Sequence, residues 1–278
     1  MKLKLFGAGH MGAALARGML RRGLKGLEIV DPDERKLKEF RELGVEATTT
    51  CHDVGAGDML MLAMPPQAFP AFAQSAAHLH GHRGTVISVM AGVTTEVISA
   101  SLRADKIIRG IPNTPSEVFE GMTLYTCTPA VSEQDESDAV SVLESIGKVA
   151  KVKDESLIDP ATALCGGGPA FVAFFADALE TFGHQAGLPA DVARRVTEQL
   201  LRGTAELMAS SGKPALQLCR EVMTPGGTTE RGIWMFEEAG LKRTVTESLA
   251  RSAARSRELG RLAAADFAAA APAAKGGQ

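Results

Sequence analysis

The sequence has few cysteines, few aromatic residues and little excess charge, and these shortages narrow its possible functions. Its four cysteines lie far apart and form no C-x-x-C pair: Cys51, Cys127, Cys165 and Cys219. This spacing argues against a zinc site and a disulfide framework, so, with no signal peptide in view, we expect a cytoplasmic protein. A net charge of −3 over 278 residues gives no reason to expect nucleic acid or an anionic membrane as a partner.

Long hydrophobic runs are also missing. No apolar stretch in the sequence is long enough to span a bilayer, so we expect no membrane segment. The clustered histidines His78, His80 and His82 have no nearby carboxylate or cysteine to complete a ligand set. Because a metal site needs ligand number and geometry together, we expect no bound metal.

A glycine-rich turn stands between a strand pattern and a helix pattern near residue 1. Residues 2–6 alternate as a strand, and apolar residues recur at helical spacing from Met11 to Met19. The turn has the pattern G-x-G-x-x-G, in the residues Gly7-Ala8-Gly9-His10-Met11-Gly12. Such glycines permit a tight turn, close approach of a pyrophosphate and close packing of helix on strand, so the turn predicts a dinucleotide-binding site.

An acidic residue follows the second predicted strand, residues 27–30. Asp31 lies 19 positions after Gly12, close to the ~20 expected of a carboxylate that binds the cofactor ribose. It would accept hydrogen bonds from the 2′-hydroxyl of NAD and repel the 2′-phosphate of NADP, although Arg35 and Lys36 on the next helix could offset the repulsion. Asp31 could instead cap that helix. The pattern favours NAD, or the use of both cofactors.

Strands and helices continue to alternate up to about residue 152. Strands are predicted at 58–64, 85–89, 106–111, 122–127 and 148–152, and helices at 67–78, 94–102 and 132–146. Near-continuous apolar strands that alternate with helices indicate a parallel sheet covered on both faces. Such sheets bind ligands at the carboxyl ends of their strands, which here carry the loops Ala63-Met64-Pro65, Met90-Ala91 and Arg109-Gly110-Ile111-Pro112-Asn113.

Beyond residue 153 almost every segment has a helical pattern, with helices predicted at 155–165, 169–186, 190–211, 214–223, 229–239 and 241–265. The stretch Gly166-Gly167-Gly168-Pro169-Ala170 separates the first two, and proline suits the first position of a helix. We therefore expect a helix N-terminus there, whose unpaired N–H groups around Gly168 would bind a carboxylate or phosphate. A glycine cluster that packs helices closely would have the same sequence.

These patterns predict two domains. An α/β, Rossmann-like, dinucleotide-binding domain would occupy residues 1–153, and an all-α helical domain would occupy residues 154–267. The last residues, 268–278, are Ala, Pro, Lys and Gly with few others, and we expect them to form a disordered tail.

A second glycine turn precedes the predicted helix 229–239. Its residues are Thr224-Pro225-Gly226-Gly227-Thr228-Thr229. Capping of the helix would explain one threonine, but it requires neither Pro-Gly-Gly nor two adjacent threonines. We therefore favour a ligand-binding turn, as a hypothesis at the level of a motif.

Three stretches together resemble the pyrroline-5-carboxylate reductase family, which catalyses the last step of proline biosynthesis. They are Gly7–Gly12, Arg109-Gly110-Ile111-Pro112-Asn113-Thr114-Pro115 and Thr224–Thr229. The resemblance extends to about residue 260. It implies reduction of the cyclic imine 1-pyrroline-5-carboxylate to L-proline by hydride transfer from NADPH or NADH to the C=N carbon. It also implies helical domains that interlock into a homodimer, which in some members assembles further, often into decamers.

The resemblance also implies roles for single residues. Met90, Ala91 and Asn113 would lie near the nicotinamide. The substrate carboxylate would bind backbone N–H groups around Gly226, Gly227 and Thr228, in the turn that begins at Thr224. Thr229 would match the family's threonine that hydrogen-bonds the imine nitrogen. Because a hydroxyl is a weak acid, we expect Thr229 to orient the imine, while the cofactor supplies the reactivity.

Departures from the family pattern keep other functions open. The usual Ser-Gly-Ser-Gly-Pro-Ala begins at Cys165 here and lacks both serines, the usual lysine of an Ala-Val-Lys-Pro loop is Pro65, and the usual serine before Pro-Gly-Gly is Thr224. A paralogue that reduces a different cyclic imine carboxylate would fit these changes, as would a non-catalytic NAD(P)-binding redox sensor. A β-hydroxyacid dehydrogenase is a third alternative, but residues 171–179 lack the lysine that is typical of that group.

Overall fold

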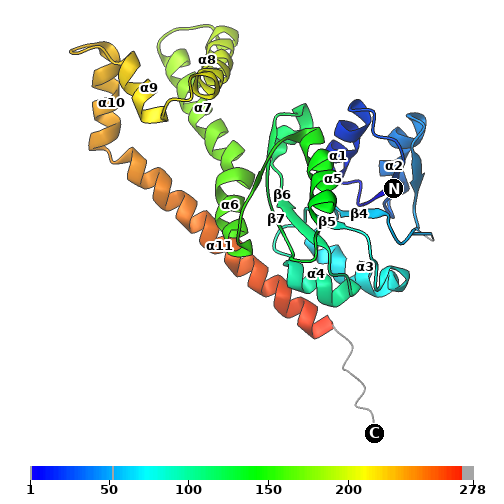
Figure 1. Cartoon of the computed structure of the whole chain (residues 1–278). Helices are drawn as coiled ribbons and strands as arrows, with labels where there is room; N and C mark the ends of the chain where they lie inside the picture. The colour runs from blue at the N-terminus through cyan, green and yellow to red at the C-terminus, as the bar shows by residue number, and fades with distance from the viewer. Residues whose placement is uncertain (1, 52, 271–278) are drawn as a thin grey trace. The chain divides into compact units, whose positions relative to one another are not determined.

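The computed structural model describes residues 2–51 and 53–270 (Figure 1). The chain forms two compact units. The first comprises Met1–Gly167 together with the chain from Arg251 onward, and the second comprises Gly168–Ala250.

The first unit is built on an eight-stranded sheet with the order β3-β2-β1-β4-β5-β6-β7-β8. Strands β1 to β6 are parallel to one another. The strand bounds are β1 Leu3–Phe6, β2 Leu27–Val30, β3 Glu46–Thr48, β4 Met59–Leu62, β5 Val86–Ser88, β6 Ile107–Ile111, β7 Gly121–Cys127 and β8 Gly147–Lys151. β1, β2, β4, β5 and β6 are buried along their whole length, as expected of strands covered on both faces.

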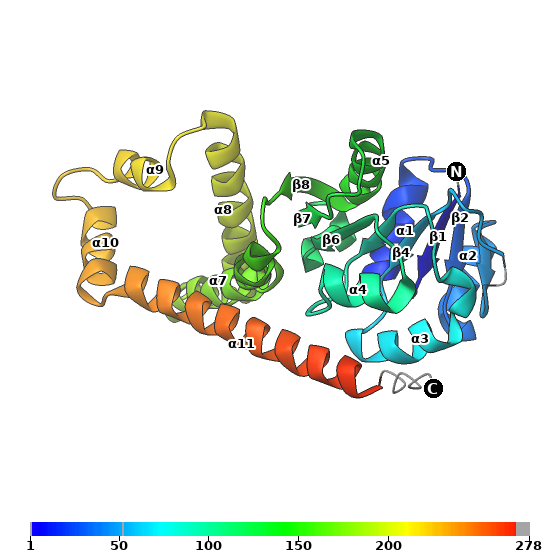
Figure 2. The same cartoon turned by 60° about the horizontal axis from the view of Figure 1, so that its bottom comes forward.

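Helices cover both faces of this sheet, and alternate residues of each strand pack against them. One hydrophobic cluster joins the sheet to α1 His10–Arg21, α2 Glu34–Glu42 and α5 Glu133–Leu143. A second joins the other face to α3 Phe69–Ser75 and α4 Thr95–Leu102. Figures 1 and 2 show α3 and α4 across the sheet from α1 and α5. The predicted Rossmann-like domain is thus confirmed.

Two features of the sheet differ from the sequence prediction. β3 was not predicted, because three residues with one exposed and one half-exposed side chain carry little hydrophobic periodicity. β7 runs antiparallel to β6, so the sheet is mixed. The physical reason is the short connection, which holds only the 3₁₀ turn Thr114–Val118, whereas a parallel crossover needs a dozen or more residues. Further 3₁₀ turns are Pro66–Ala68, Ala77–Leu79, Glu144–Ile146 and Glu155–Leu157.

Helix α7 begins at Gly168, inside the glycine cluster, but the chain that leads into it is also helical. Helical structure runs from Glu155 to Gln185, through α6 Ile158–Ala161, the π-helical turn Thr162–Gly166 and α7 Gly168–Gln185. Gly167 has right-handed helical backbone angles, and its N–H donates to the carbonyl of Thr162. The predicted start of this helix at Pro169 thus agrees with α7 to within one residue, but helical structure leads directly into it, which was not expected. Glycine and proline are tolerated here because a π-turn absorbs the break in the hydrogen-bond pattern.

This continuity also corrects the expectation about long apolar runs. By length and composition alone, Glu155–Gln185 is long and apolar enough to cross a membrane. The sequence prediction divides this segment into two short helices at the glycines. Core helices of soluble proteins can have the same length and composition, so this segment alone is weak evidence for a membrane.

The second unit is helical, as predicted. It contains α7, α8 Ala190–Ser211, α9 Ala215–Val222, α10 Thr228–Glu238 and the first part of α11 Leu241–Ala270. Pro189 and Pro214 occupy the N-caps of α8 and α9, and Gly212 ends α8 with φ of 64°. α11 continues through Ala268–Ala270, where a disordered tail was expected, and residues 271–278 of that tail lie outside the described residues.

Candidate active site

The carboxyl ends of five parallel strands meet at one edge of the sheet. The register aligns Phe6 at the end of β1 with Val30 of β2 and Leu62 of β4, and β5 and β6 follow in the same direction. The predicted cofactor residues follow these ends: Gly7–Gly12, Asp31, Ala63-Met64-Pro65, Met90-Ala91 and Asn113. β1 lies between β2 and β4, so the strand order reverses beside the glycine turn, which is where such sheets bind ligands.

Packing demands two of the three glycines in the first turn. Gly7 has φ of 101°, and a Cβ there would lie 2.7 Å from the backbone nitrogen of Met64. A Cβ on Gly12 would collide with the carbonyl oxygen of Gly7 and lie 3.3 Å from the Cβ of Ala63. Gly9 differs, because a Cβ there would meet no atom within 4 Å. The turn is thus tight at its two ends and open at its middle, where a ligand has room.

The open side of this turn carries unpaired hydrogen-bond donors. Among the residues that the structure describes, the backbone N–H groups of His10, Met11 and Gly12 donate to no protein acceptor. They form the first turn of α1, which has 12 residues. Unpaired N–H groups and the positive end of the helix dipole favour a phosphate anion. The side chain of His10 is 75% exposed, and its Nδ1 lies 2.9 Å from Oε1 of Glu117.

Asp31 contacts the glycine turn and does not cap α2. The N-cap of α2 is Asp33, which accepts a hydrogen bond from the N–H of Arg35. Asp31 is buried, and its Oδ2 accepts a hydrogen bond of 2.7 Å from the N–H of Ala8. The alternative of Asp31 as a helix cap is therefore wrong, and the carboxylate lies beside the predicted dinucleotide turn.

The loops after β5 and β6 are fixed by different contacts. Met90 is buried and donates its N–H to Oγ of Ser88, while Ala91 is exposed. The side-chain oxygen of Asn113 accepts a hydrogen bond of 2.9 Å from the N–H of Met122, so Asn113 ties β6 to β7. Its side-chain N–H₂ group donates to no other residue that the structure describes, which leaves it as a donor at the edge of the sheet.

A partly buried ion pair behind this edge was not foreseen from the sequence. The Arg109 side chain, 4% exposed, donates to Oε1 of Glu155 over 2.7 Å. The same carboxylate accepts hydrogen bonds from the N–H and the hydroxyl of Thr95 at the start of α4. The pair therefore joins β6 to the helix after the Met90–Val93 loop. From the sequence, Arg109 is only part of a motif. Glu155 lies 46 positions further along the chain, and no pattern in the sequence indicates that the two residues pair.

α11 supplies a second unforeseen contact. Gly92 has φ of 74°, and a Cβ on it would lie 3.4 Å from the Cα of Gly260. Ser256, one turn earlier in α11, donates its hydroxyl to Asp159. In the sequence, the only indication that α11 approaches Gly92 closely was Gly260, a single glycine within a 30-residue helix.

The second glycine turn lies in the other unit, at the start of α10. Gly226 has φ of 70°, and its N–H donates to the Glu230 carboxylate over 2.7 Å. The N–H of Gly227 donates to the carbonyl of Thr224. In the described part of the chain, the N–H groups of Thr228 and Thr229 have no acceptor. The glycines therefore shape the turn, and the two threonines present its open donors.

Cys165, which stands where the family pattern has a serine, points into the first unit. Its Sγ lies 3.1 Å from the carbonyl oxygen of Met122 and 3.9 Å from that of Ile111. Burial raises the pKa of this thiol above its usual range, so little reactive thiolate forms at neutral pH. The thiol thus makes a structural contact between the π-turn and the ends of β6 and β7.

We expect Cys165→Ser to retain fold and turnover. A serine hydroxyl can donate to the same carbonyl of Met122, and the change in volume is small. Turnover and the melting temperature, each compared with the unmodified chain, test this prediction. A loss of turnover without a loss of stability would show that the thiol takes part in the reaction.

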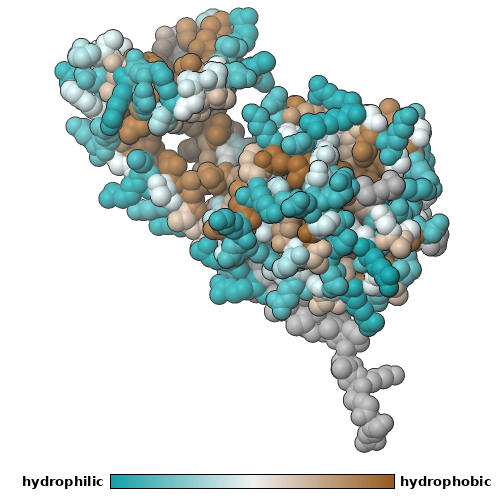
Figure 3. All heavy atoms as spheres, in the orientation of Figure 1, coloured by the Kyte–Doolittle hydropathy of each residue, from teal (hydrophilic) through white to brown (hydrophobic). Residues whose placement is uncertain are grey.

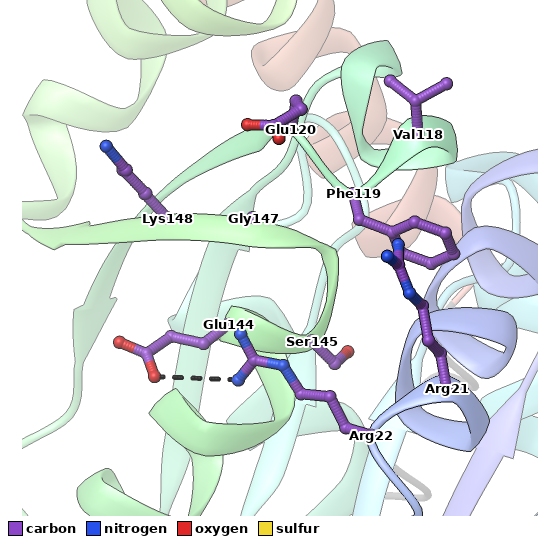
Figure 4. A pocket seen from close by; sticks show the side chains of 9 residues that line it. All are labelled: Arg21, Arg22, Val118, Phe119, Glu120, Glu144, Ser145, Gly147 and Lys148. Atoms are coloured by element: carbon purple, nitrogen blue, oxygen red, sulfur yellow. Dashed lines mark ion pairs between the residues drawn. The ribbon is translucent and has the colours of Figure 1, made fainter. Parts of the chain in front are cut away.

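Other clustered side chains lie away from this edge. A pocket of about 480 Å³ contains Arg21, stacked 4.3 Å over the ring of Phe119, and Arg22, paired with Glu144 at 4.0 Å (Figure 4). None of the predicted site residues lines it. Nε2 of His80 and of His82 each lie against a backbone carbonyl. No set of three metal-binding side chains occurs in the described ranges 2–51 and 53–270.

Comparisons with known proteins identify relatives of the whole chain. Residues 155–259 match the family model for pyrroline-5-carboxylate reductase dimerisation, and residues 2–92 match that for coenzyme F420-dependent NADP oxidoreductase. The chain is 33% identical over 265 residues to pyrroline-5-carboxylate reductase 3 of Danio rerio, covering 94% of this chain and 92% of the relative. It is 32% identical to the pyrroline-5-carboxylate reductase of Thermus thermophilus, covering 94% and 99%.

Solved structures give the same answer for the fold. A pyrroline-5-carboxylate reductase from Coxiella burnetii superposes with a TM-score of 0.86 at 29% identity, covering 93% of this chain and 98% of that one. A Plasmodium falciparum pyrroline carboxylate reductase with NADP bound has a TM-score of 0.81 at 24% identity, covering 94% and 99%, and supports the fold alone. By sequence over nearly its full length, this chain belongs to the pyrroline-5-carboxylate reductase family.

Proposed function

We propose that this chain reduces 1-pyrroline-5-carboxylate to L-proline with NADH or NADPH. The observation that carries the proposal is the Thr224–Thr229 turn, whose open N–H groups and hydroxyls begin α10 in a chain of this family. When bound, the reduced cofactor supplies the hydride. The protein residues bind, orient and position the two reactants, which can contribute on the order of 7–11 kcal/mol to lowering the barrier.

The residues at the sheet edge fit a dinucleotide. The pyrophosphate would bind the N–H groups of His10, Met11 and Gly12, where Gly9 leaves room. The other proposed cofactor contacts are Gly7, Ala8, Asp31, Ala63, Met64, Pro65, Met90, Ala91 and Asn113. The free amide of Asn113 is suited to a carbonyl acceptor such as the nicotinamide carboxamide.

The substrate would bind at the second turn. Because the N–H groups of Gly226 and Gly227 are already bonded within the turn, the carboxylate would bind those of Thr228 and Thr229 most directly. Thr224 borders the same turn, and Gly168, the first residue of α7, is a further candidate contact of the substrate. The hydroxyl of Thr229 would hydrogen-bond the imine nitrogen. The proton on that nitrogen would come from solution or through water, since a hydroxyl is a poor general acid.

We further propose that the functional form is a homodimer built through the helical unit. Large apolar side chains of α7, α8 and α10 are exposed in the single chain, including Phe174 at 80% and Phe182 at 71%. Hydrophobic surface is visible over this unit in Figure 3. Monomers rarely expose so much apolar surface. Assembly into decamers and a cytoplasmic location remain predictions.

The test is an assay of the full chain for oxidation of NADH and NADPH with 1-pyrroline-5-carboxylate. Pyrroline-2-carboxylate and piperideine carboxylates are assayed in parallel. Turnover that is highest on 1-pyrroline-5-carboxylate supports the proposal. Turnover on another imine alone would make this chain a repurposed paralogue. Binding of NAD(H) without turnover of any imine would favour the redox sensor.

A further inference from the structure

The structure bears on which of the two cofactors the chain selects, through the contacts of Asp31. Its carboxylate is held from three sides. Oδ2 accepts from the N–H of Ala8 over 2.7 Å, Oδ1 accepts from the N–H of Asp33 over 2.9 Å, and Nζ of Lys36 lies 3.3 Å from both oxygens. The residue is 3% exposed. The carboxylate is therefore fixed at the carboxyl end of β2, against the glycine turn.

The two nearby cations are already paired with carboxylates. Arg35 donates through Nε and Nη2 to both oxygens of Asp33, at 2.9 and 2.8 Å, and its side chain is 90% exposed. The hydrogen bonds from Arg35 lower the pKa of Asp33 to about 2. Lys36 faces Asp31. Each cation thus already has an anionic partner in the chain, so a bound phosphate would have to draw one of them away from its carboxylate.

The chemistry of the two cofactors differs at the 2′ position of the adenosine ribose. A 2′-hydroxyl can donate a hydrogen bond to a carboxylate, whereas a 2′-phosphate carries about −1.5 to −2 charges and has only acceptor oxygens to offer. Placing that phosphate beside Asp31 would bring like charges together in a poorly solvated place. Lys36 is neutralised by Asp31 and cannot also balance the phosphate.

We propose that Asp31 makes this chain select NADH over NADPH, with Lys36 serving as the counter-ion of Asp31. The inference rests on the proposed function only in assuming that a dinucleotide binds at the glycine turn. The family model that matches residues 2–92 is named for NADP, so a preference for NADH would not be expected from that match.

The experiment measures the Kd of NADH and of NADPH by fluorescence titration of the full chain, and kcat/KM for each with 1-pyrroline-5-carboxylate. We expect the unmodified chain to favour NADH at least tenfold in both. Asp31→Asn keeps an oxygen that can accept from Ala8 but removes the charge, and Asp31→Ser removes the carboxylate. Both variants should lower the preference for NADH over NADPH at least tenfold, in affinity and in kcat/KM.

Glu34→Gln is the matched control. It removes a neighbouring negative charge from the first turn of α2, but the partner of Glu34 is Arg41, so Arg35 and Lys36 keep their carboxylates and the preference for NADH should stay unchanged. The inference is overturned if the unmodified chain binds and uses NADPH as well as NADH, or better. It is also overturned if both Asp31 variants keep the full preference for NADH.

The Kd values need no substrate, so the two proposals fail separately. NADH-selective binding without imine reduction would refute the proposed function alone. Imine reduction with equal use of the two cofactors would refute the cofactor preference alone.

Discussion

Replacing Gly12 by alanine is expected to abolish measurable binding of NADH and NADPH and to lower the melting temperature. The new Cβ would collide with the carbonyl oxygen of Gly7 and press on Ala63. The first obstacle is backbone in the turn that follows β1, so it cannot swing aside as a flexible side chain would. The start of α1 must shift, and a misplacement of about 1 Å in a positioning group can cost about 10²-fold.

Gly9→Ala separates the two effects of that prediction. Gly9 has φ of −69°, and a Cβ on it would meet no atom within 4 Å, so alanine there should leave the melting temperature unchanged. It should still weaken cofactor binding, because the methyl group would occupy the room left for the pyrophosphate. Kd from fluorescence titration and thermal melting measure both quantities. Binding by the Gly12 variant with an unaltered Kd would remove the glycine turn from the cofactor site.

The sequence was sufficient for the layers of the fold because its patterns are local. The apolar strands β1, β2, β4, β5 and β6 are short and continuous, and the helices between them keep one apolar face, so period and length identify both. Predicted helices 190–211, 214–223 and 229–239 differ from α8, α9 and α10 by no more than a residue at each end. Prolines and glycines at the ends of α8 and α9 provide the physical reason.

The features that the sequence did not predict depend on tertiary contacts. Glycines 166 to 168 and the proline after them are the residue types that usually end a helix or begin one. Helical structure nevertheless continues, because Cys165 and the π-turn pack against β6 and β7. The direction of β7 follows from the length of one connection. Hydrophobic periodicity predicts neither the continuation of helical structure through the glycines nor the direction of β7, because it carries no information on strand direction or on tertiary contacts.

The sequence motifs located the candidate site, whereas its side-chain contacts were seen only in the structure. The glycine turn and the strand ends were predictable, because strand ends of a parallel sheet must lie together. The spacing of the glycine turn and Asp31 indicated that the two lie close together, but it did not show the hydrogen bond from Ala8. The ion pair between Arg109 and Glu155 joins residues with no common motif. The pairing of Lys36 with Asp31 needed the side-chain positions, which is why cofactor preference stayed open at the level of sequence.

The second large effect is expected from Thr229→Ala, which should lower kcat by roughly 10- to 100-fold. A hydrogen bond to a charged group contributes about 1.5–3 kcal/mol, and the iminium nitrogen of the substrate would lose such a bond. The Kd of the cofactor should stay nearly unchanged, because Thr229 is assigned to the substrate. Stability should not fall either, since alanine favours the first turn of α10 at least as well as threonine does.

Two further variants make this result specific to the hydroxyl. Thr229→Ser keeps the hydroxyl on the same backbone position and should restore most of kcat, whereas Thr229→Val keeps the shape and should not. The backbone N–H of residue 229 survives in all three, so KM for the carboxylate should move less than kcat. This split follows from a side chain that orients the imine and an N–H that binds the carboxylate. If kcat of the alanine variant equals that of the unmodified chain, Thr229 has no part in the reaction, and the turn would then act through its backbone alone.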